Sequence, residues 1–256
     1  MTSSALRHHA GGWILLALLL GSWQVSAKYL VASPNWPPLS SVLVSGMEGL
    51  YSGELLNTFS ETLLRMFAGY AIGVFVAVCS GMVLGTSRLL YRAFEPIIEI
   101  LRPIPIPAII PPLILLFGIG DSLKLFVVSF STFFPVFINT IQGVRSVDPV
   151  AVNVSRTFGV SRSRYIRNVV LPSSLPFVLA GMRISLSTAL IVIVVVEMFA
   201  GSSGVGNYLM TTQFAMRPSD MYAAILLLAL VGYSLNRIFV LIERRVIRWY
   251  FELVPA

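Results

Sequence analysis

Long apolar stretches that carry almost no charge constrain this chain more than any other feature of its sequence. Six such stretches are separated by short charged segments, and the fifth is interrupted once, by Arg183. Each is close to the length that crosses a hydrocarbon core of about 30 Å as an α-helix. The stretches cover residues of about 11–27, 66–85, 103–120, 125–141, 175–200 and 221–242. We therefore expect an integral membrane protein.

Composition and hydrogen bonding predict the fold class. Hydrophobic residues make up 56% of the chain and charged residues 11%, which leaves too little polar surface to cover one soluble core. Within a bilayer only helices and closed barrels satisfy their own backbone hydrogen bonds, and the apolar stretches lack the alternation of barrel strands. We expect an all-α fold, a polytopic bundle of about six transmembrane helices. Residues 1–256 should form a single transmembrane domain, with an N-terminal span at about 11–27 and a core at about 60–249.

The first apolar stretch has two interpretations. It follows Arg7 and ends in Val25, Ser26 and Ala27, a pattern that is also typical of a cleavable signal peptide. If the stretch is retained, it is the first membrane span. Cleavage would leave five spans and place the two ends of the mature chain on opposite sides of the membrane.

The distribution of arginine and lysine predicts the orientation. When the connections between the stretches are counted alternately, twelve of these residues fall on one side and three on the other. Short loops with this bias place the richer side in the cytoplasm, so we expect both termini there. The richer side holds Arg7, Arg88, Arg92, Arg102, Arg145, Arg156, Arg162, Arg164, Arg167, Arg244, Arg245 and Arg248. The poorer side holds Lys28, Lys124 and Arg217.

Other features exclude several classes of function. The net charge of +7 comes from arginine clusters between apolar stretches rather than from one basic face, so nucleic acid is not an expected partner. Cys79 is the only cysteine, and His8 and His9 have no acidic neighbour, so we expect no metal site and no cofactor. The chain has no G-x-x-x-x-G-K-[ST] phosphate loop, so it cannot bind ATP in the usual way by itself.

The longest polar connection, at residues 148–176, is patterned rather than slack. Asp148 before Pro149 is a helix-start signal, and Gly159 permits a sharp turn because it tolerates positive φ. A second short basic helix, at residues 161–168, should end as Leu171 and Pro172 lead into the fifth span. The pattern fits a rigid lever at the cytoplasmic surface, and it also fits an amphipathic hairpin that lies on anionic lipid.

Residues 148–172 resemble the signature loop of the permease subunits of binding-protein-dependent ABC importers. The usual form of that loop is E-A-A, three residues, G, nine residues and I-x-L-P. Gly159, Leu171 and Pro172 match it at the expected spacing, whereas Val169 replaces the usual Ile. The E-A-A positions are occupied by other residues, so the docking contribution of the family's Glu is missing here. The resemblance implies an ATPase-coupling loop that includes Asn153, Val154, Ser155, Phe158, Gly159, Leu171 and Pro172.

The resemblance extends over most of the chain, from about residue 60 to residue 249. The segments RPIPIPAIIPPLILLFGIGDSLK, FFPVFINTIQGVRSVD, LPFVLAGMRISLSTA and VEMFAGSSGVGNYL are similar to segments typical of the nitrate/sulfonate/taurine branch. This implies a permease in the bacterial cytoplasmic (inner) membrane that forms the path of a small anionic solute and is not itself an enzyme. The implied partners are an ATPase subunit, an extracytoplasmic solute-binding protein and a second copy of the chain.

Glu197 is the only acidic residue inside an apolar stretch. Because a carboxylate at membrane depth is costly, it should face the bundle interior or water. It has either a gating role on the translocation path or a structural role with an arginine or a backbone amide as its partner. An ionised Glu197 would repel an anionic substrate, which favours gating or structure over binding. Arg65 follows Glu61 at helical spacing, and we expect that pair to be structural.

The third apolar stretch is rich in proline. Pro105, Pro107 and Pro111 each remove a backbone donor, and such breaks are tolerated where a water-lined path or neighbouring helices satisfy the freed carbonyls. These residues are therefore candidates for the lining of the path, and the alternative is a simple kinked or short helix. An ion-coupled secondary transporter is the alternative function, but more buried ionisable residues or a repeated half would be expected of it.

Overall fold

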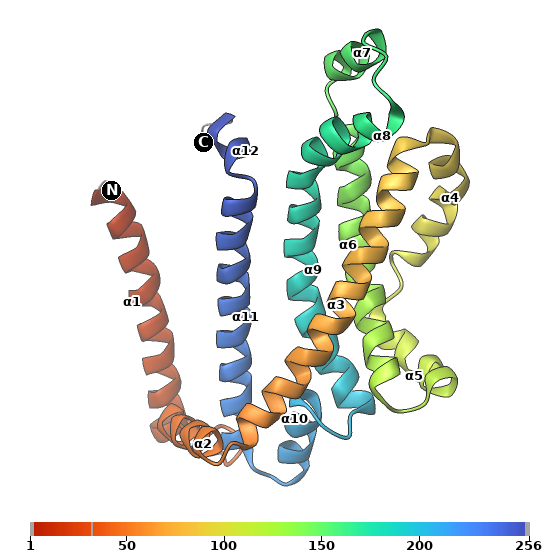
Figure 1. The fold of residues 1–256 in the computed structure, drawn as a ribbon. Helices are drawn as coiled ribbons and strands as arrows, with labels where there is room; N and C mark the ends of the chain where they lie inside the picture. The colour runs from red at the N-terminus through yellow and green to blue at the C-terminus, as the bar shows by residue number, and fades with distance from the viewer. Residues whose placement is uncertain (1–2, 32, 254–256) are drawn as a thin grey trace. The chain divides into compact units, whose positions relative to one another are not determined.

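In a computed structural model the chain is described over residues 3–31 and 33–253. The regular elements over these residues are helices, and the predicted all-α fold is confirmed (Figure 1). In chain order they are α1 Ser3–Val25, α2 Leu39–Tyr51, α3 Glu54–Thr86, α4 Arg88–Leu101, α5 Ile106–Phe117, α6 Asp121–Arg145, α7 Pro149–Thr157, α8 Arg162–Tyr165, α9 Leu171–Ala200, α10 Val205–Phe214, α11 Pro218–Val246 and α12 Arg248–Leu253. Two π-helical turns, Ser26–Leu30 and Ile166–Val170, extend α1 and precede α9.

Five helical segments of the described chain are long and apolar enough to cross a membrane. They are Gly11–Leu30, Glu54–Thr86, Asp121–Arg145, Arg162–Ala200 and Pro218–Val246. A sixth crossing exists if α4 and α5, which meet at a bend of 96°, count as one broken span. The predicted number of about six spans is therefore confirmed as five helical segments and one broken span. Several helices also begin earlier than predicted: α3 begins at Glu54 and α6 at Asp121.

The predicted third span, at residues 103–120, is not one straight helix. Its helical part, α5, has 12 residues, or about 18 Å at 1.5 Å per residue, which is too short to cross a hydrocarbon core alone. Pro103 and Pro105 lack backbone donors and disfavour helical geometry in the residues before them, so the chain breaks between α4 and α5. The prediction of one span at residues 103–120 is therefore corrected to a broken span made of α4 and α5.

The chain divides into two compact units, which we describe separately. The first unit comprises residues Met1–Phe59 and Tyr208–Leu230. Its aromatic cluster joins Trp23 of α1 to Trp36, with ring centroids 5.6 Å apart, and Trp36 to Tyr222 of α11, at 5.9 Å. The Trp23 indole N–H also donates to the carbonyl oxygen of Pro37 at 3.1 Å. The helix α2, Leu39–Tyr51, follows this cluster in the same unit.

The second unit comprises residues Ser60–Asn207 and Val231–Ala256, and α3, α6 and α9 pack at its centre. One face of α3 carries a small residue at every fourth position: Gly69, Gly73, Ala77, Gly81 and Gly85. A Cβ added at any of the four glycines would lie less than 3 Å from atoms of α6. This spacing lets the two backbones approach closely, as small residues do in membrane helix pairs.

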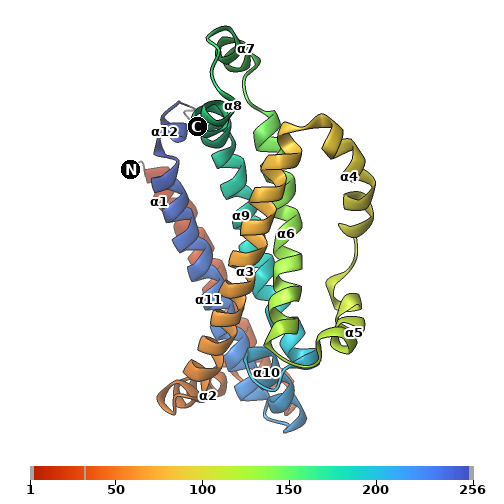
Figure 2. The same cartoon turned by 45° about the vertical axis from the view of Figure 1, so that its right-hand side comes forward.

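The two ends of this second unit carry the two candidate sites. The loop that contains α7 projects at one end of the α3, α6 and α9 group (Figures 1 and 2). At the other end lie α5 and the turn between α9 and α10 (Figure 2). The length of α6 and α9 therefore separates the loop from the Glu197 site.

Candidate functional sites

The coupling loop is a short helix held between a cap and a glycine turn. The Asp148 carboxylate accepts a hydrogen bond from the backbone N–H of Val150 at 2.8 Å, which caps α7 at its start. Gly159 adopts a φ of +62°, and the backbone N–H of Val160 donates to the Ser155 carbonyl oxygen at 2.9 Å. These contacts end α7 in the manner of a left-handed C-terminal turn. The helix start and the bend at Gly159 are as predicted.

The second helix of the loop does not end where we predicted. Helical structure continues from Arg162 through Leu171 and Pro172 to Ala200. A π-helical turn, Ile166–Val170, lies just before Pro172. The hydrogen bonds of such a turn are spaced differently from those of an α-helix, and this tolerates the missing backbone N–H of proline. The helix is therefore not broken. The loop therefore joins the fifth span as one continuous helical element.

An apolar ridge runs along the exposed side of α7. Val150, Val154 and Phe158 are spaced four residues apart, and their exposed fractions are 65%, 48% and 80%. Asn153 is also exposed, whereas the hydroxyl of Ser155 turns back to the Ala151 carbonyl oxygen at 2.8 Å. Apolar side chains that protrude in this way on a polar loop indicate an interaction surface for a partner protein or for lipid.

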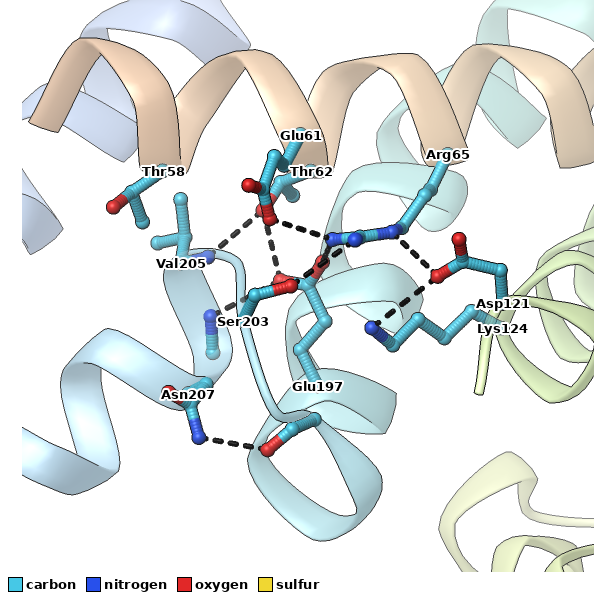
Figure 3. A network of polar contacts seen from close by, with 12 residues as sticks. Thr58, Glu61, Thr62, Arg65, Asp121, Lys124, Glu197, Ser203, Val205 and Asn207 are labelled. Carbon is cyan, nitrogen blue, oxygen red and sulfur yellow. Dashed lines mark hydrogen bonds and ion pairs between the residues drawn. The ribbon is translucent and has the colours of Figure 1, made fainter. Parts of the chain in front are cut away.

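Glu197 lies in the last turn of α9 and is completely buried. Its Oε2 accepts a hydrogen bond from the Thr62 hydroxyl at 2.8 Å and another from the backbone N–H of Gly206 at 3.1 Å (Figure 3). The Thr62 oxygen in turn accepts the backbone N–H of Val205 at 2.8 Å. One carboxylate oxygen thus joins α3 to the start of α10.

Arg65 of α3 forms an ion pair with the same carboxylate and with two others. Its Nη1 lies 3.6 Å from Glu197 Oε1, an oxygen that has no hydrogen bond, and 3.3 Å from Glu61 Oε2. Its Nε donates to Asp121 Oδ1 at 2.7 Å, and its Nη2 donates to the Ser203 hydroxyl at 3.0 Å. Four partners from three parts of the chain therefore converge on one guanidinium (Figure 3).

Lys124 completes the cluster from α6. Its side chain is only 2% exposed, and its ammonium nitrogen lies 3.6 Å from Asp121 Oδ1. The cluster, which we call the Glu197 network, contains the carboxylates of Glu61, Asp121 and Glu197 and the cations of Arg65 and Lys124. Within the described chain no three His, Cys, Asp or Glu residues are grouped so that they could hold a metal ion.

The turn between α9 and α10 fits closely around Glu197. Gly204 has a φ of +95°, and a Cβ added there would overlap the Glu197 carboxylate. A Cβ on Gly206 would overlap the Val194 carbonyl oxygen. The Asn207 amide donates to the Gly201 carbonyl oxygen at 2.7 Å and closes the turn. Gly204 and Gly206 therefore allow the backbone to reach the carboxylate.

The structure does not bring all predicted residues together. Pro105 caps the start of α5, Pro107 lies in its first turn and Pro111 lies inside it, and all three are exposed. None of them belongs to the Glu197 network. The expected partners of Glu197, an arginine and a backbone amide, are present as Arg65 and Gly206. Sequence patterns identified Glu61 and Arg65 as a pair, whereas Thr62, Asp121, Lys124 and Ser203 had no pattern that linked them to Glu197.

Five helical segments of membrane length, a sixth broken one and buried ion pairs define a polytopic α-helical membrane protein. Residues 69–248 match the family described as "Binding-protein-dependent transport system inner membrane component". Because the match covers more than half of the chain, the chain belongs to this family. It is thus a permease subunit, the membrane component of an ABC importer, and the predicted family and function class are confirmed.

Two relatives match nearly the whole chain. SsuC of Bacillus subtilis, named for the transport of aliphatic sulfonates, is 31% identical over 93% of this chain and 87% of its own length. The nitrate import permease protein NrtB of Synechococcus elongatus is 29% identical over 91% of this chain and 85% of its own length.

A solved structure shares the fold. An inward-facing structure of the MetNI methionine ABC transporter matches with a TM-score of 0.67 at 21% identity. The match covers 75% of this chain and 95% of the other. This likeness supports the permease fold and says nothing of the solute.

Proposed function

We propose that this permease subunit works as a pair of copies with two ATPase subunits and an extracytoplasmic solute-binding protein. The ATPases hydrolyse ATP, and the chain itself, acting as one transmembrane domain over residues 1–256, forms the path. ATP-driven closure of the ATPases would draw the two coupling loops together and open the path outward.

The apolar ridge of α7 supports this proposal most directly. Three exposed apolar side chains stand on a helix that is capped at Asp148 and turned at Gly159, so the ridge is presented on a rigid loop. Asn153, Val154 and Phe158 would contact the ATPase, whereas Leu171 and Pro172 would transmit the movement along the continuous helix to α9.

The solute that we propose is a small oxyanion of the sulfonate or nitrate class. SsuC is named for aliphatic sulfonates and NrtB for nitrate, and both groups present three oxygens around one central atom. Relatives for both chemistries support this class of solute and do not choose between its members.

We propose a cytoplasmic position for α7 and both termini. Twelve arginines on the predicted cytoplasmic side against three basic residues on the other support this orientation. The Glu197 network then lies toward the outer side, where it would act on the translocation path as a gate support. Pro105, Pro107 and Pro111 would line the path through the broken span, since they are exposed on α5.

Reconstitution tests the proposal. The chain would be purified with its cognate ATPase subunit and placed in liposomes with the binding protein and radiolabelled ethanesulfonate or nitrate. We expect uptake that requires both ATP and binding protein and that persists when a protonophore collapses the proton gradient. Uptake that follows an ion gradient and ignores ATP would instead support the alternative, an ion-coupled secondary transporter.

A further inference from the structure

Arg183 places a charge inside the fifth span. It lies about 18 Å along α9 from Leu171, at 1.5 Å per residue, well within the membrane-crossing segment. Its side chain is nevertheless 47% exposed. A charged side chain at such a depth is costly unless it faces protein, water or a ligand, and intramembrane charges commonly mark substrate or ion pathways. Arg183 takes no part in the Glu197 network or the coupling loop.

A pocket of about 360 Å³ opens beside Arg183, between α9 and the part of α11 that belongs to the same unit. Ser187 follows Arg183 by one helical turn on α9, and Asn236 and Glu243 line the facing side from α11. The remaining lining residues, Ala180 and Ile184, are apolar. A pocket in which several polar groups converge beside apolar residues is a candidate ligand site.

The hydrogen bonding of this pocket leaves donors unused. Arg183 donates from Nε to the Asn236 side-chain oxygen at 3.3 Å, and its Nη1 lies 3.9 Å from Glu243 Oε2. Over residues 3–31 and 33–253, Arg183 Nη2 and the Ser187 hydroxyl make no hydrogen bond, and neither does the Asn236 amide nitrogen. Three donor groups thus border one pocket beside a single positive charge.

These donors fit one chemical class of ligand. A guanidinium presents its N–H groups in a planar fork that matches two oxygens of a planar or trigonal oxyanion. The Arg183–Glu243 ion pair is long, so it is weaker than a close bidentate pair. An entering anion can therefore replace Glu243 as the partner of Nη1. Because Glu243 remains nearby to take the guanidinium back, the anion would be released again, as a translocation path requires.

We propose that the Arg183 pocket is an anion-binding site on the translocation path, at which the guanidinium of Arg183 and the donors of Ser187 and Asn236 hold the oxyanion group of the solute. This inference rests on the proposed function and deepens it by naming residues that contact the solute. An anionic lipid headgroup carries the same oxyanion chemistry, so the experiment must distinguish the two sources.

Thiol chemistry in the pocket tests the proposal without requiring transport. Cys79 would be replaced by Ser and a thiol introduced as Ala180→Cys, which lines the pocket but contributes none of the donors. The full chain, with its ATPase, would be reconstituted in phosphatidylcholine nanodiscs. The reaction rates of an anionic sulfonatoethyl and a cationic trimethylammonioethyl methanethiosulfonate reagent would then be compared.

We expect the anionic reagent to be favoured, and Arg183→Gln to lower the ratio of the two rates about tenfold, because one unit charge is removed at roughly 6 Å. Arg183→Lys, which keeps the charge, should preserve most of the ratio. A thiol at the exposed position Tyr51 on the predicted outer side, introduced as Tyr51→Cys, is the control, and its ratio should not respond to Arg183→Gln. Ethanesulfonate and nitrate at millimolar concentration should slow the Ala180→Cys reaction at least threefold, whereas chloride should not.

Three outcomes would overturn the inference. A thiol that reacts with neither reagent would mean that the pocket is closed to water and anions. A ratio that is unchanged by Arg183→Gln would mean that Arg183 does not control the pocket. Slowing by added phosphatidylglycerol, without protection by ethanesulfonate or nitrate, would assign the pocket to lipid headgroups. None of these readings depends on uptake, so the failure of the proposed import function would be recognised separately by the liposome assay.

A transport measurement provides a second readout. In the reconstituted complex, Arg183→Gln should reduce uptake at least tenfold while hydrolysis stimulated by the binding protein remains within twofold of wild type. Arg237→Gln is the matched control, since Arg237 is exposed and donates to Tyr233 of its own helix at 2.9 Å. Equal uptake in wild type and Arg183→Gln would contradict the proposal.

Discussion

The Thr62 hydroxyl and the Glu197 carboxylate, separated by 135 residues in the chain, share a buried hydrogen bond of 2.8 Å. Thr62 also accepts the Val205 N–H, so a single side chain of α3 connects the end of α9 with the start of α10. Polar groups that are buried in this way are costly when one partner is removed, because the other is left without a hydrogen bond. The Glu197 network therefore holds the turn between α9 and α10 against α3.

Replacing Thr62 by Val tests this connection with almost no change of volume. The substitution leaves the Val205 N–H without an acceptor and Glu197 with one donor fewer, and we expect a loss of about 2–4 kcal/mol of stability. The measurement is the fraction of monodisperse protein that survives heating in detergent. Thr86→Val is the control, because the Thr86 hydroxyl bonds only carbonyl oxygens of its own helix, at 3.0 and 3.1 Å. Equal losses in both variants would contradict the role of Thr62.

Glu197→Gln should leave the protein inserted and keep part of its uptake, whereas Glu197→Ala should lose more. Gln retains an oxygen that can accept from Thr62 and Gly206 but loses the ion pair with Arg65. Ala removes both and leaves the buried partners unsatisfied, at a cost of about 2–5 kcal/mol. Uptake and thermal survival would be measured at equal membrane expression. Wild-type behaviour of both variants would show that the carboxylate is dispensable.

Gly204→Ala tests how closely the turn fits around the carboxylate. The added Cβ meets strain from the φ of +95° and also overlaps the Glu197 carboxylate. Gly118→Ala carries the φ strain alone, since Gly118 has a φ of +70° and no atom lies within 4 Å of its added Cβ. We expect Gly118→Ala to cost about 1–3 kcal/mol, because its φ of +70° and ψ of −177° lie in a region essentially restricted to glycine, and Gly204→Ala to cost more because of the added overlap. Similar thermal survival of the two variants would argue against close packing at Gly204.

Gly159→Val should uncouple the complex while the membrane helices remain inserted. The φ of +62° resists a β-branched residue, at a cost of roughly 1–3 kcal/mol. Among the described residues no atom lies within 4 Å of an added Cβ, so bulk within the subunit is not the cause. Gly159→Asn is the matched variant, because Asn tolerates positive φ, and it should retain coupling.

The readout for Gly159 is ATP hydrolysis stimulated by the loaded binding protein, together with retention of the ATPase on purification. Asn153→Glu, which introduces the residue usual in the family, should be tolerated and should strengthen ATPase retention. Full stimulation in Gly159→Val would mean that the loop is not the coupling element, and the interpretation as a lipid-surface hairpin would be favoured.

Both chain ends should be shielded from impermeant thiol reagents in intact cells. The expectation follows from the asymmetry of twelve basic residues against three. Single cysteines would be placed near the N-terminus and after Arg248 in a Cys79→Ser chain, and a cysteine at Ser33, on the predicted outer side, is the positive control. Labelling of the N-terminal site, or a mature chain that begins near Lys28, would contradict the retained first span.

Much of this fold could be predicted from the sequence, because its cause is local. A segment in hydrocarbon must satisfy its own backbone hydrogen bonds, so long apolar stretches predict helices and approximate spans. The cap at Asp148 and the turn at Gly159 follow from side-chain and backbone preferences within a few residues. The broken span was harder to predict from the sequence. The prolines predicted a disturbance of the helix, but the 96° bend between α4 and α5 depends on how each helix packs.

The sequence by itself thus determined the helices, the loop and the isolated acid Glu197, because each depends on neighbouring residues. Only the tertiary structure joined Thr62, Arg65, Asp121 and Lys124 around that acid, and only it placed Asn236 and Glu243 beside Arg183. These partners come from helices that are distant in the chain, and no periodicity relates their positions. Which faces of α3, α6, α9 and α11 meet is decided by close packing, as at the glycines of α3, and the polar contacts follow from that packing.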